Sequence, residues 1–403
     1  MGNEPWGILH MDLKAIQQSL RDSYLDGWLF YDHHFRDLIA YHILRIKPPM
    51  CSRRWYYFIP ASGEPAKLTH KIENENLDGL PGRHESYATW SEQREKLSKM
   101  LSGSKRVAME YSPLNDIPYI GLVDAGTVEL VKSFGLEVAS SANLVQMFEA
   151  RWPPAALESH LSAGKAIHQI VRQTFQWIGN AVRSGKAIGE YAVQQEMVRL
   201  FESNGLEADA PPLVAVNAHS GNPHYSPDAT HSAPVRANDF VLLDVWGKRR
   251  EPGAVYFDIT WTGFVGEKVP SRYQEIFAIV RRARDAAVER VQQALRAGEE
   301  LCGFQVDDAA RSVIAGAGYG DYFIHRTGHS IGEDVHGNGA NMDNFETHDD
   351  RRVMPGTCFS VEPGIYLPEF GVRSEVDVYV EERDARVTGE IQQAIVPILA
   401  GGA

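Results

Sequence analysis

Two apolar runs near the middle of the chain each contain one aspartate. Asp244 lies in residues 240–246, FVLLDVW, and Asp258 lies in residues 254–262, AVYFDITWT. The polar, glycine-containing segment between them predicts a β-hairpin centred near Glu251, with Asp244 directly opposite Asp258. Opposed like charges destabilise a sheet, and buried carboxylates are rare unless they are paired or bound to a cation. The runs therefore predict either a cation site between two strands or another register, in which one aspartate lies at a turn or an edge.

A second pair of carboxylates lies in apolar strands near the carboxyl end of the chain. Glu362 belongs to residues 359–364 and Glu375 to residues 371–380, and the two glutamates are 13 positions apart, against 14 for the aspartates. The similar spacing is expected if two related hairpins, one from each half of a duplicated domain, meet at one centre. Four carboxylates buried together would repel one another and their pKa values would rise, unless cations neutralise them. Two divalent metal ions would supply the positive charge that this requires.

The segment between these pairs is rich in histidine and glycine. In residues 324–336, IHRTGHSIGEDVH, we expect a strand to end near His325 and to lead into a glycine-bracketed turn that holds His329, with His336 further on. Imidazole is the usual nitrogen ligand of Mn, Fe, Co and Zn. Two alternatives are surface histidines on a flexible loop and a zinc site from His325 and His329 alone. The zinc alternative lacks the glutamate that a metalloprotease helix carries between two such histidines.

A pair of prolines divides the chain into two predicted domains. Before them, a helix at 12–24 and short strands at 28–31, 54–59, 66–70 and 106–111 indicate an α/β domain. Residues 151–154, RWPP, interrupt this pattern, because tandem prolines cannot continue a helix. We therefore expect a small amino-terminal α/β domain at 1–152 and a second domain at 153–403.

The second domain shows two successive rounds of helices and strands. Its helices are predicted at 157–182 and 188–204, then at 270–297 and 306–317, and strands follow each pair. This order indicates a duplicated αβ architecture, although the sequence shows no direct repeat.

Composition excludes several classes of protein. The 40 Lys and Arg against 53 Asp and Glu give a net charge of −13, which argues against nucleic-acid binding because that requires a basic face. No apolar stretch approaches the ~18 residues that span a bilayer, so we expect no membrane partner. The three cysteines are scattered, which indicates a reducing compartment. Met1 to Trp6 lacks the basic start and apolar run of a leader. The expected location is the cytoplasm.

The ordered set of residues resembles the pita-bread metallopeptidase family, which includes methionine aminopeptidase, aminopeptidase P and prolidase. The resemblance rests on Asp, Asp, Gly-His-x-x-Gly, Glu-Pro-Gly and Gly-Val-Arg-x-Glu in this order, and it covers residues 155–400 or so. It implies a pita-bread domain with two pseudo-twofold αβ halves that binds two divalent metal ions. Oxygen-rich coordination with one imidazole favours Mn²⁺, with Co²⁺, Zn²⁺ or Fe²⁺ as alternatives. The implied metal ligands are Asp244, Asp258, His329, Glu362 and Glu375.

The same resemblance implies roles for residues around the metals. His224 matches the histidine that contacts the scissile peptide region, and His336 matches the one that binds the substrate carbonyl and stabilises the tetrahedral intermediate. His325 and Arg373 match positions that line the prime-side pocket and support the site. Glu362 would carry a proton to the leaving nitrogen. The chain departs from the family where Gly337 follows His336 in place of an acidic residue.

The amino-terminal domain narrows the implied activity. It is similar to that of the aminopeptidase P, prolidase and creatinase branch, so the resemblance implies a metallopeptidase that hydrolyses Xaa-Pro bonds in peptides, as an aminopeptidase or a dipeptidase, and that forms a homodimer. One alternative is a metal-dependent hydrolase or lyase of a small non-peptide substrate on the same fold. Another is a non-catalytic binding module, but such modules lose metal ligands that this chain keeps.

Overall fold

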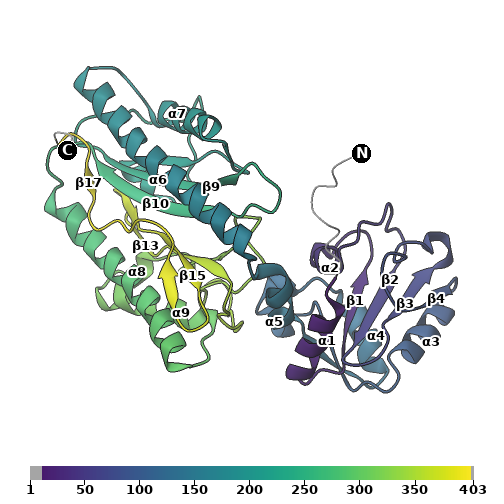
Figure 1. Ribbon diagram of the computed structural model, residues 1–403. Helices are drawn as coiled ribbons and strands as arrows, with labels where there is room; N and C mark the ends of the chain where they lie inside the picture. Colours follow the sequence, from purple (N-terminus) through teal and green to yellow (C-terminus); the bar gives the residue numbers. More distant parts are fainter. Residues whose placement is uncertain (1–10, 401–403) are drawn as a thin grey trace. The chain divides into compact units, whose positions relative to one another are not determined.

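The computed structural model describes residues 11–400, and the chain divides into two compact units with the boundary between Glu149 and Ala150 (Figure 1). The segment from Met1 to Trp6, which the sequence suggests is not a leader, lies outside the described residues. Among the described residues, no helix is long and apolar enough to cross a membrane. Each unit has its own apolar cores, and the fold is mixed α/β, as the sequence predicts.

The first unit is a six-stranded sheet with helices on both faces. The strand order is β4-β3-β2-β1-β5-β6, and only β2 runs antiparallel to the others. Two separate clusters of buried residues, one on each face, pack the sheet against its helices. The strands are β1 (Gly27–Asp32), β2 (Trp55–Pro60), β3 (Ala66–His70), β4 (Arg83–Tyr87), β5 (Arg106–Met109) and β6 (Glu137–Ser140). The helices are α1 (Leu13–Asp22), α2 (Leu38–Leu44), α3 (Trp90–Met100), α4 (Ala125–Ser133) and α5 (Ala142–Val145).

The second unit begins with a pair of helices packed on a sheet. Apolar residues of α6 (Pro154–Arg183) and α7 (Glu190–Ser203) share one core with the central strands β9 (Phe240–Arg249) and β10 (Phe257–Phe264). The same sheet contains β7 (Leu206–Glu207), β8 (Leu213–Val216) and β17 (Val396–Pro397). The proline pair marks the start of a helix. Pro154 is the first residue of α6, where the backbone N–H that proline lacks would have no hydrogen-bond partner within the helix.

A second pair of helices repeats this arrangement. The helices α8 (Ser271–Ala297) and α9 (Gly303–Gly316) pack against each other and on strands from the carboxyl end of the chain. These strands form one sheet of β11 (Ser330–Ile331), β12 (Cys358–Val361), β15 (Val376–Val380) and β16 (Ala385–Val387), and a short pair of β13 (Gly364–Tyr366) and β14 (Gly371–Arg373). Helix pairs and strands thus occur in two rounds, as the sequence predicts.

Two expected strands are wrong in detail. No strand ends at His325, because a short 3₁₀ turn at Gly320–Tyr322 and irregular backbone precede it. The segment predicted as one strand at 371–380 is split in two: β14 pairs with β13, and β15 pairs with β12. Ser374 and Glu375 lie in the break, so Glu375 stands where the chain passes from one sheet to the next.

The loop that carries His329 is held by a close approach of two backbones. Gly328 lies against Met342, with which it forms a β-bridge, and a Cβ atom at Gly328 would overlap the carbonyl oxygen of Ser360. Only glycine fits here without moving the backbone next to His329.

We therefore expect Gly328→Ala to lower the free energy of unfolding by about 1–3 kcal/mol, which is the usual cost of overpacking. Urea denaturation followed by circular dichroism would measure this difference. Gly316→Ala is the matched control, because Gly316 ends α9 and nothing lies within 4 Å of its added Cβ. Equal stability of the two variants would contradict the close approach at Gly328.

Candidate metal centre

The two aspartates lie on neighbouring strands, but not opposite each other. In the β9–β10 ladder Asp244 pairs with Thr260, and Asp258 pairs with Trp246. The expected register is wrong by two residues because the connection is asymmetric: β9 continues to Arg249, whereas the residues from Ala254 to Tyr256 stay outside the ladder. Since side chains alternate along a strand, a shift of two residues keeps both carboxylates on the same face. They are diagonal neighbours there.

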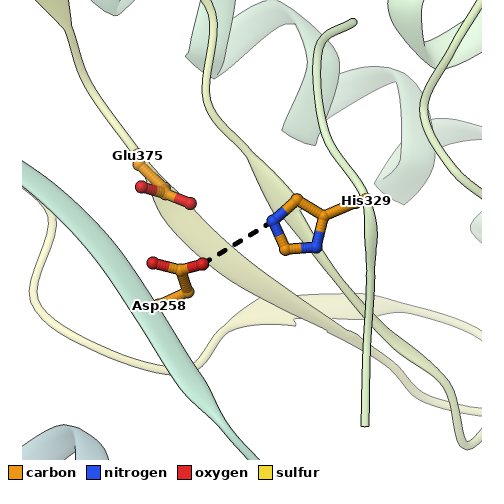
Figure 2. Close-up of side chains that lie close together, drawn as sticks. All are labelled: Asp258, His329 and Glu375. Atoms are coloured by element: carbon orange, nitrogen blue, oxygen red, sulfur yellow. Dashed lines mark ion pairs between the residues drawn. The ribbon is translucent and has the colours of Figure 1, made fainter. Parts of the chain in front are cut away.

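Three of the predicted ligands converge on one point. Asp258, His329 and Glu375 are buried, and one ligand atom of each lies within 4.8 Å of the others. Figure 2 shows the carboxylates of Asp258 and Glu375 directed toward the same edge of the His329 ring. The Nε2 atom of His329 is 3.6 Å from Asp258 Oδ2 and 3.5 Å from Glu362 Oε1. Glu362 therefore belongs to the same cluster.

The fifth residue, Asp244, joins the cluster through Arg373 and Thr260. The buried guanidinium of Arg373 pairs with the Asp244 carboxylate and lies 3.8 Å from Glu362 Oε2. The hydroxyl of Thr260 donates to Glu375 Oε2 at 2.7 Å and lies 3.3 Å from Asp244 Oδ1. The structure thus brings together all five residues that the resemblance assigns as ligands.

Hydrogen bonds from strand backbones fix these side chains. Asp377 Oδ2 accepts from the Asp258 amide at 2.8 Å, which ties β10 to β15 across the boundary between the two sheets. The His329 amide donates to Ser360 Oγ at 3.0 Å, and the Ser360 amide donates back to the His329 carbonyl at 2.9 Å. Each contact ties the backbone of a cluster residue to a residue of β12 or β15, so the geometry of the cluster depends on how these strands are placed.

Burial and mutual repulsion displace the pKa values of the carboxylates. Burial, together with the charges of Asp244 and Glu362, holds the pKa of Asp258 well above its usual value. Burial and the charge of Asp258 do the same for Glu375. Burial also raises the pKa of Glu362, but the nearby His329 and Arg373 more than offset this, so its pKa lies below the ordinary value. A group of carboxylates in this state is stabilised by any added positive charge.

The donor set fits divalent metal ions. Asp258 Oδ1 is buried and has no hydrogen-bond partner among the described residues, which is costly unless a cation binds it. The Nδ1 atom of His329 is 3.1 Å from the Ser330 carbonyl, to which only a protonated nitrogen can donate. This fixes the tautomer and leaves the Nε2 lone pair directed at the carboxylates. Carboxylate oxygens with one imidazole suit Mn²⁺, Co²⁺, Fe²⁺ or Zn²⁺.

The other predicted site residues lie at varying distances from this cluster. The ring of His336 packs edge-on against that of His329, with centroids 4.4 Å apart. His325 donates from Nδ1 to the Arg326 carbonyl and accepts from the Tyr366 hydroxyl at 2.7 Å, and burial lowers its pKa to about 4, so it is neutral. His224 is exposed, and among the described residues its ring makes no hydrogen bond to the cluster.

One residue that the sequence does not single out holds the loop containing His224. Glu190, in the first turn of α7, is completely buried, and Tyr225 donates to its Oε2 at 2.6 Å. Its Oε1 accepts from the Val216 amide and from His219 Nδ1, and the Ala233 amide donates to Oε2 at 2.7 Å. A glutamate at a helix start is normally a surface residue that interacts favourably with the helix dipole, so this buried role could not be expected from the local sequence.

These observations define a class of protein: a duplicated αβ domain that carries a buried carboxylate–imidazole cluster suited to divalent metals. Sequence comparison agrees, since the model of metallopeptidase family M24 matches residues 161–382. This match covers more than half of the chain, and the chain belongs to metallopeptidase family M24.

Individual relatives support the assignment. The chain is 33% identical over 202 residues to an Xaa-Pro dipeptidase of Lactobacillus delbrueckii subsp. lactis, covering 50% of each protein. It is 32% identical over 211 residues to an Xaa-Pro dipeptidase of Pyrococcus furiosus, covering 51% of this chain and 54% of that protein. The sequence match thus spans about half the length of these curated relatives.

Solved structures share the fold over nearly the whole chain. The crystal structure of dipeptidase PepE from Mycobacterium ulcerans has a TM-score of 0.67 at 22% identity, with 96% of each chain covered. A prolidase from Thermococcus sibiricus has a TM-score of 0.59 at 20% identity, covering 96% of this chain and 98% of that one.

The carboxylate cluster predicts opposite effects of Asp258→Asn with and without metal. In metal-free protein the variant should be at least as stable as the wild type, because one member of a repelling group is neutral. With Mn²⁺ at about 100 times its Kd, the wild type should gain about 2.7 kcal/mol and the variant much less.

Thermal denaturation with and without Mn²⁺, together with elemental analysis, would measure both effects. Glu289→Gln, an exposed substitution on α8, should leave the metal response unchanged. An Asp258→Asn protein that binds and responds to Mn²⁺ like the wild type would contradict the assignment.

Proposed function

We propose that this protein is an Xaa-Pro peptidase that hydrolyses the bond before proline with the help of two divalent metal ions per chain, Mn²⁺ being preferred. The observation that carries the proposal is the convergence of five acidic and imidazole side chains in a family of metallopeptidases. Because two similar proteins are named Xaa-Pro dipeptidase, we expect this protein to prefer dipeptides over longer peptides.

Different groups would supply the nucleophile, carry the proton and stabilise the oxyanion. Bound divalent ions would lower the pKa of a water molecule and so supply the nucleophile at neutral pH. Glu362, 3.5 Å from His329, would accept the proton of this water and pass it to the leaving nitrogen. His336, beside His329, would donate a hydrogen bond to the developing oxyanion, a contact worth about 3 kcal/mol in comparable sites.

The substrate would be held on two sides. His325 and Arg373 lie on one side of the cluster, where His325 contacts the Tyr366 hydroxyl and Arg373 pairs with Asp244. We propose that the proline residue of the substrate binds beside His325 and Arg373. His224, in the loop anchored by Glu190, would contact the scissile peptide region from another segment of the chain.

The resemblance and the cysteines bear on assembly and location. We propose a homodimer, as the resemblance to the aminopeptidase P and prolidase branch implies. We propose a cytoplasmic location, because the three cysteines are free thiols and two of them, Cys51 and Cys358, are buried away from any partner sulfur.

Activity is tested first with a substrate panel. Metal-loaded protein should hydrolyse Xaa-Pro dipeptides faster than matched Xaa-Ala dipeptides, and Asp258→Asn should lower kcat/KM by at least about 100-fold because a metal ligand is lost. Glu289→Gln is the control, and ninhydrin detection of released proline gives the rate. A protein with two bound metals that cleaves none of the Xaa-Pro peptides, short or long, would contradict the proposal.

The anchoring role of Glu190 is tested separately. In Glu190→Gln one acceptor oxygen becomes a donor amide, which leaves a buried donor such as Tyr225 unsatisfied, so unfolding should be easier by about 1–3 kcal/mol. If the loop positions His224, KM for the dipeptide should rise in the folded protein. Glu196→Gln on the same helix, whose carboxylate pairs with Arg199 near the surface, should change KM little. A less stable Glu190→Gln with unchanged kcat and KM would show that Glu190 is only structural.

A further inference from the structure

A hollow lies entirely within the first unit, and none of its lining residues belongs to the carboxylate cluster. It measures about 670 Å³, which is within the range of small-molecule sites. Its walls include Tyr31 at the end of β1, His70 at the end of β3 and Tyr87 at the end of β4. These three strands are parallel, so the hollow lies at their carboxyl edge. Ligands of open α/β sheets bind at this edge.

Two helices begin at the hollow. Trp90 is the first residue of α3, and Gly126 and Thr127 lie in the first turn of α4; all three line the hollow. Helix N-termini carry partial positive charge and unpaired backbone N–H groups, which favour anions. This geometry alone defines no site, and the side chains supply the second observation.

The lining is strongly basic in a chain whose net charge is −13. Six of its side chains are cationic or can become so: His33, Arg36, Arg53, Arg54, His70 and Arg94. The one carboxylate in the lining is Asp124, and it is already engaged, because the amide and hydroxyl of Thr127 both donate to it at 2.9 Å. Glu73 lies beside Arg53, whose amide donates to it at 3.0 Å, but Glu73 is not part of the wall.

Three of the arginines in this lining have no carboxylate within ion-pair distance among the described residues. In residues 11–400, Arg36, Arg54 and Arg94 form no ion pair with a carboxylate, and Arg94 instead lies over the Trp90 ring at 5.2 Å. Burial lowers the pKa of His33, and the charges of His34, Arg36 and Arg54 lower it further. Crowded cations without counter-ions are destabilising, and a bound anion would remove this cost.

We propose that this hollow is a binding site for a small organic phosphate. Guanidinium groups bind phosphate oxygens in a bidentate manner, and several of them suit a doubly charged group better than a single carboxylate. Trp90, which is 68% exposed, and Leu130 offer an apolar surface for the organic part of the ligand. A nucleic-acid strand fits less well, because the large negative net charge would repel a polyanion outside the hollow. The site is independent of the proposed peptidase activity.

The test is isothermal titration calorimetry of the full-length Asp258→Asn protein, in which phosphate binding at the metal centre is suppressed. The probes are inorganic phosphate and phenyl phosphate, with benzoate and citrate as carboxylate counterparts. Phenyl phosphate should bind with one site per chain, more tightly than benzoate, and its affinity should fall with ionic strength. Adding Arg54→Gln should weaken it at least tenfold, and Arg36→Gln provides a second variant if the first unfolds.

Arg83→Gln is the matched control. Arg83 is the first residue of β4, at the opposite end of the strand from Tyr87, and its ion-pair partner among residues 11–400 is the exposed Glu64. Its loss should leave phenyl phosphate binding unchanged.

Three results would overturn the proposal: no phosphate binding at millimolar concentration, equal or better binding of the carboxylates, or equal weakening by Arg83→Gln and Arg54→Gln. Binding that occurs in the wild type but vanishes in Asp258→Asn would place the phosphate at the metal centre and would also overturn it.

Discussion

The repulsion among buried carboxylates is the constraint on which the second unit depends. Asp244, Asp258 and Glu375 are buried, with Asp258 and Glu375 within 4.8 Å of each other, and burial is the largest cause that raises the pKa of each of the three. In the chain itself, the cation that offsets this repulsion most directly is Arg373, which pairs with Asp244. Such a cluster is costly for folding, and proteins keep costly clusters where function requires them. Bound divalent metal ions would neutralise the buried carboxylates and so remove their mutual repulsion.

The fold keeps this cluster in place through backbone contacts at the boundary between two sheets. Asp377 holds the Asp258 amide, and Gly328 allows the His329 loop to approach Ser360 closely. Each half of the duplicated domain supplies its part: β9 and β10 carry the aspartates, and the segments around β12 and β15 carry the glutamates. Because the ligands sit on or beside paired strands, a change in register would disperse them. A metal-binding cluster assembled from both halves of the domain agrees with membership of metallopeptidase family M24.

The two units separate two kinds of electrostatic environment. The second unit concentrates acidic groups in its interior, where they suit cations, whereas the first concentrates arginines around a hollow at the carboxyl edge of its sheet. The net charge of −13 does not reveal this difference, because it is the sum over both units. The chemistry of the amino-terminal unit therefore favours an anionic ligand of its own.

Local sequence patterns predicted α1, the four long helices of the second unit, the longer strands and the acidic residues of the cluster, because apolar periodicity and an aspartate within an apolar run are visible in one segment at a time. The helices α2 to α5 and many of the short strands were not predicted. Local patterns did not determine the register of β9 and β10, which depends on how many residues of the connection leave the ladder. Nor did they reveal Thr260, Glu190 or the basic hollow. Thr260 acts through its position opposite Asp244, Glu190 is buried by a loop more than twenty residues away, and the hollow gathers side chains from positions 31 to 130. Such contacts exist only once the chain has folded, since their partners are distant in sequence and no local preference encodes them.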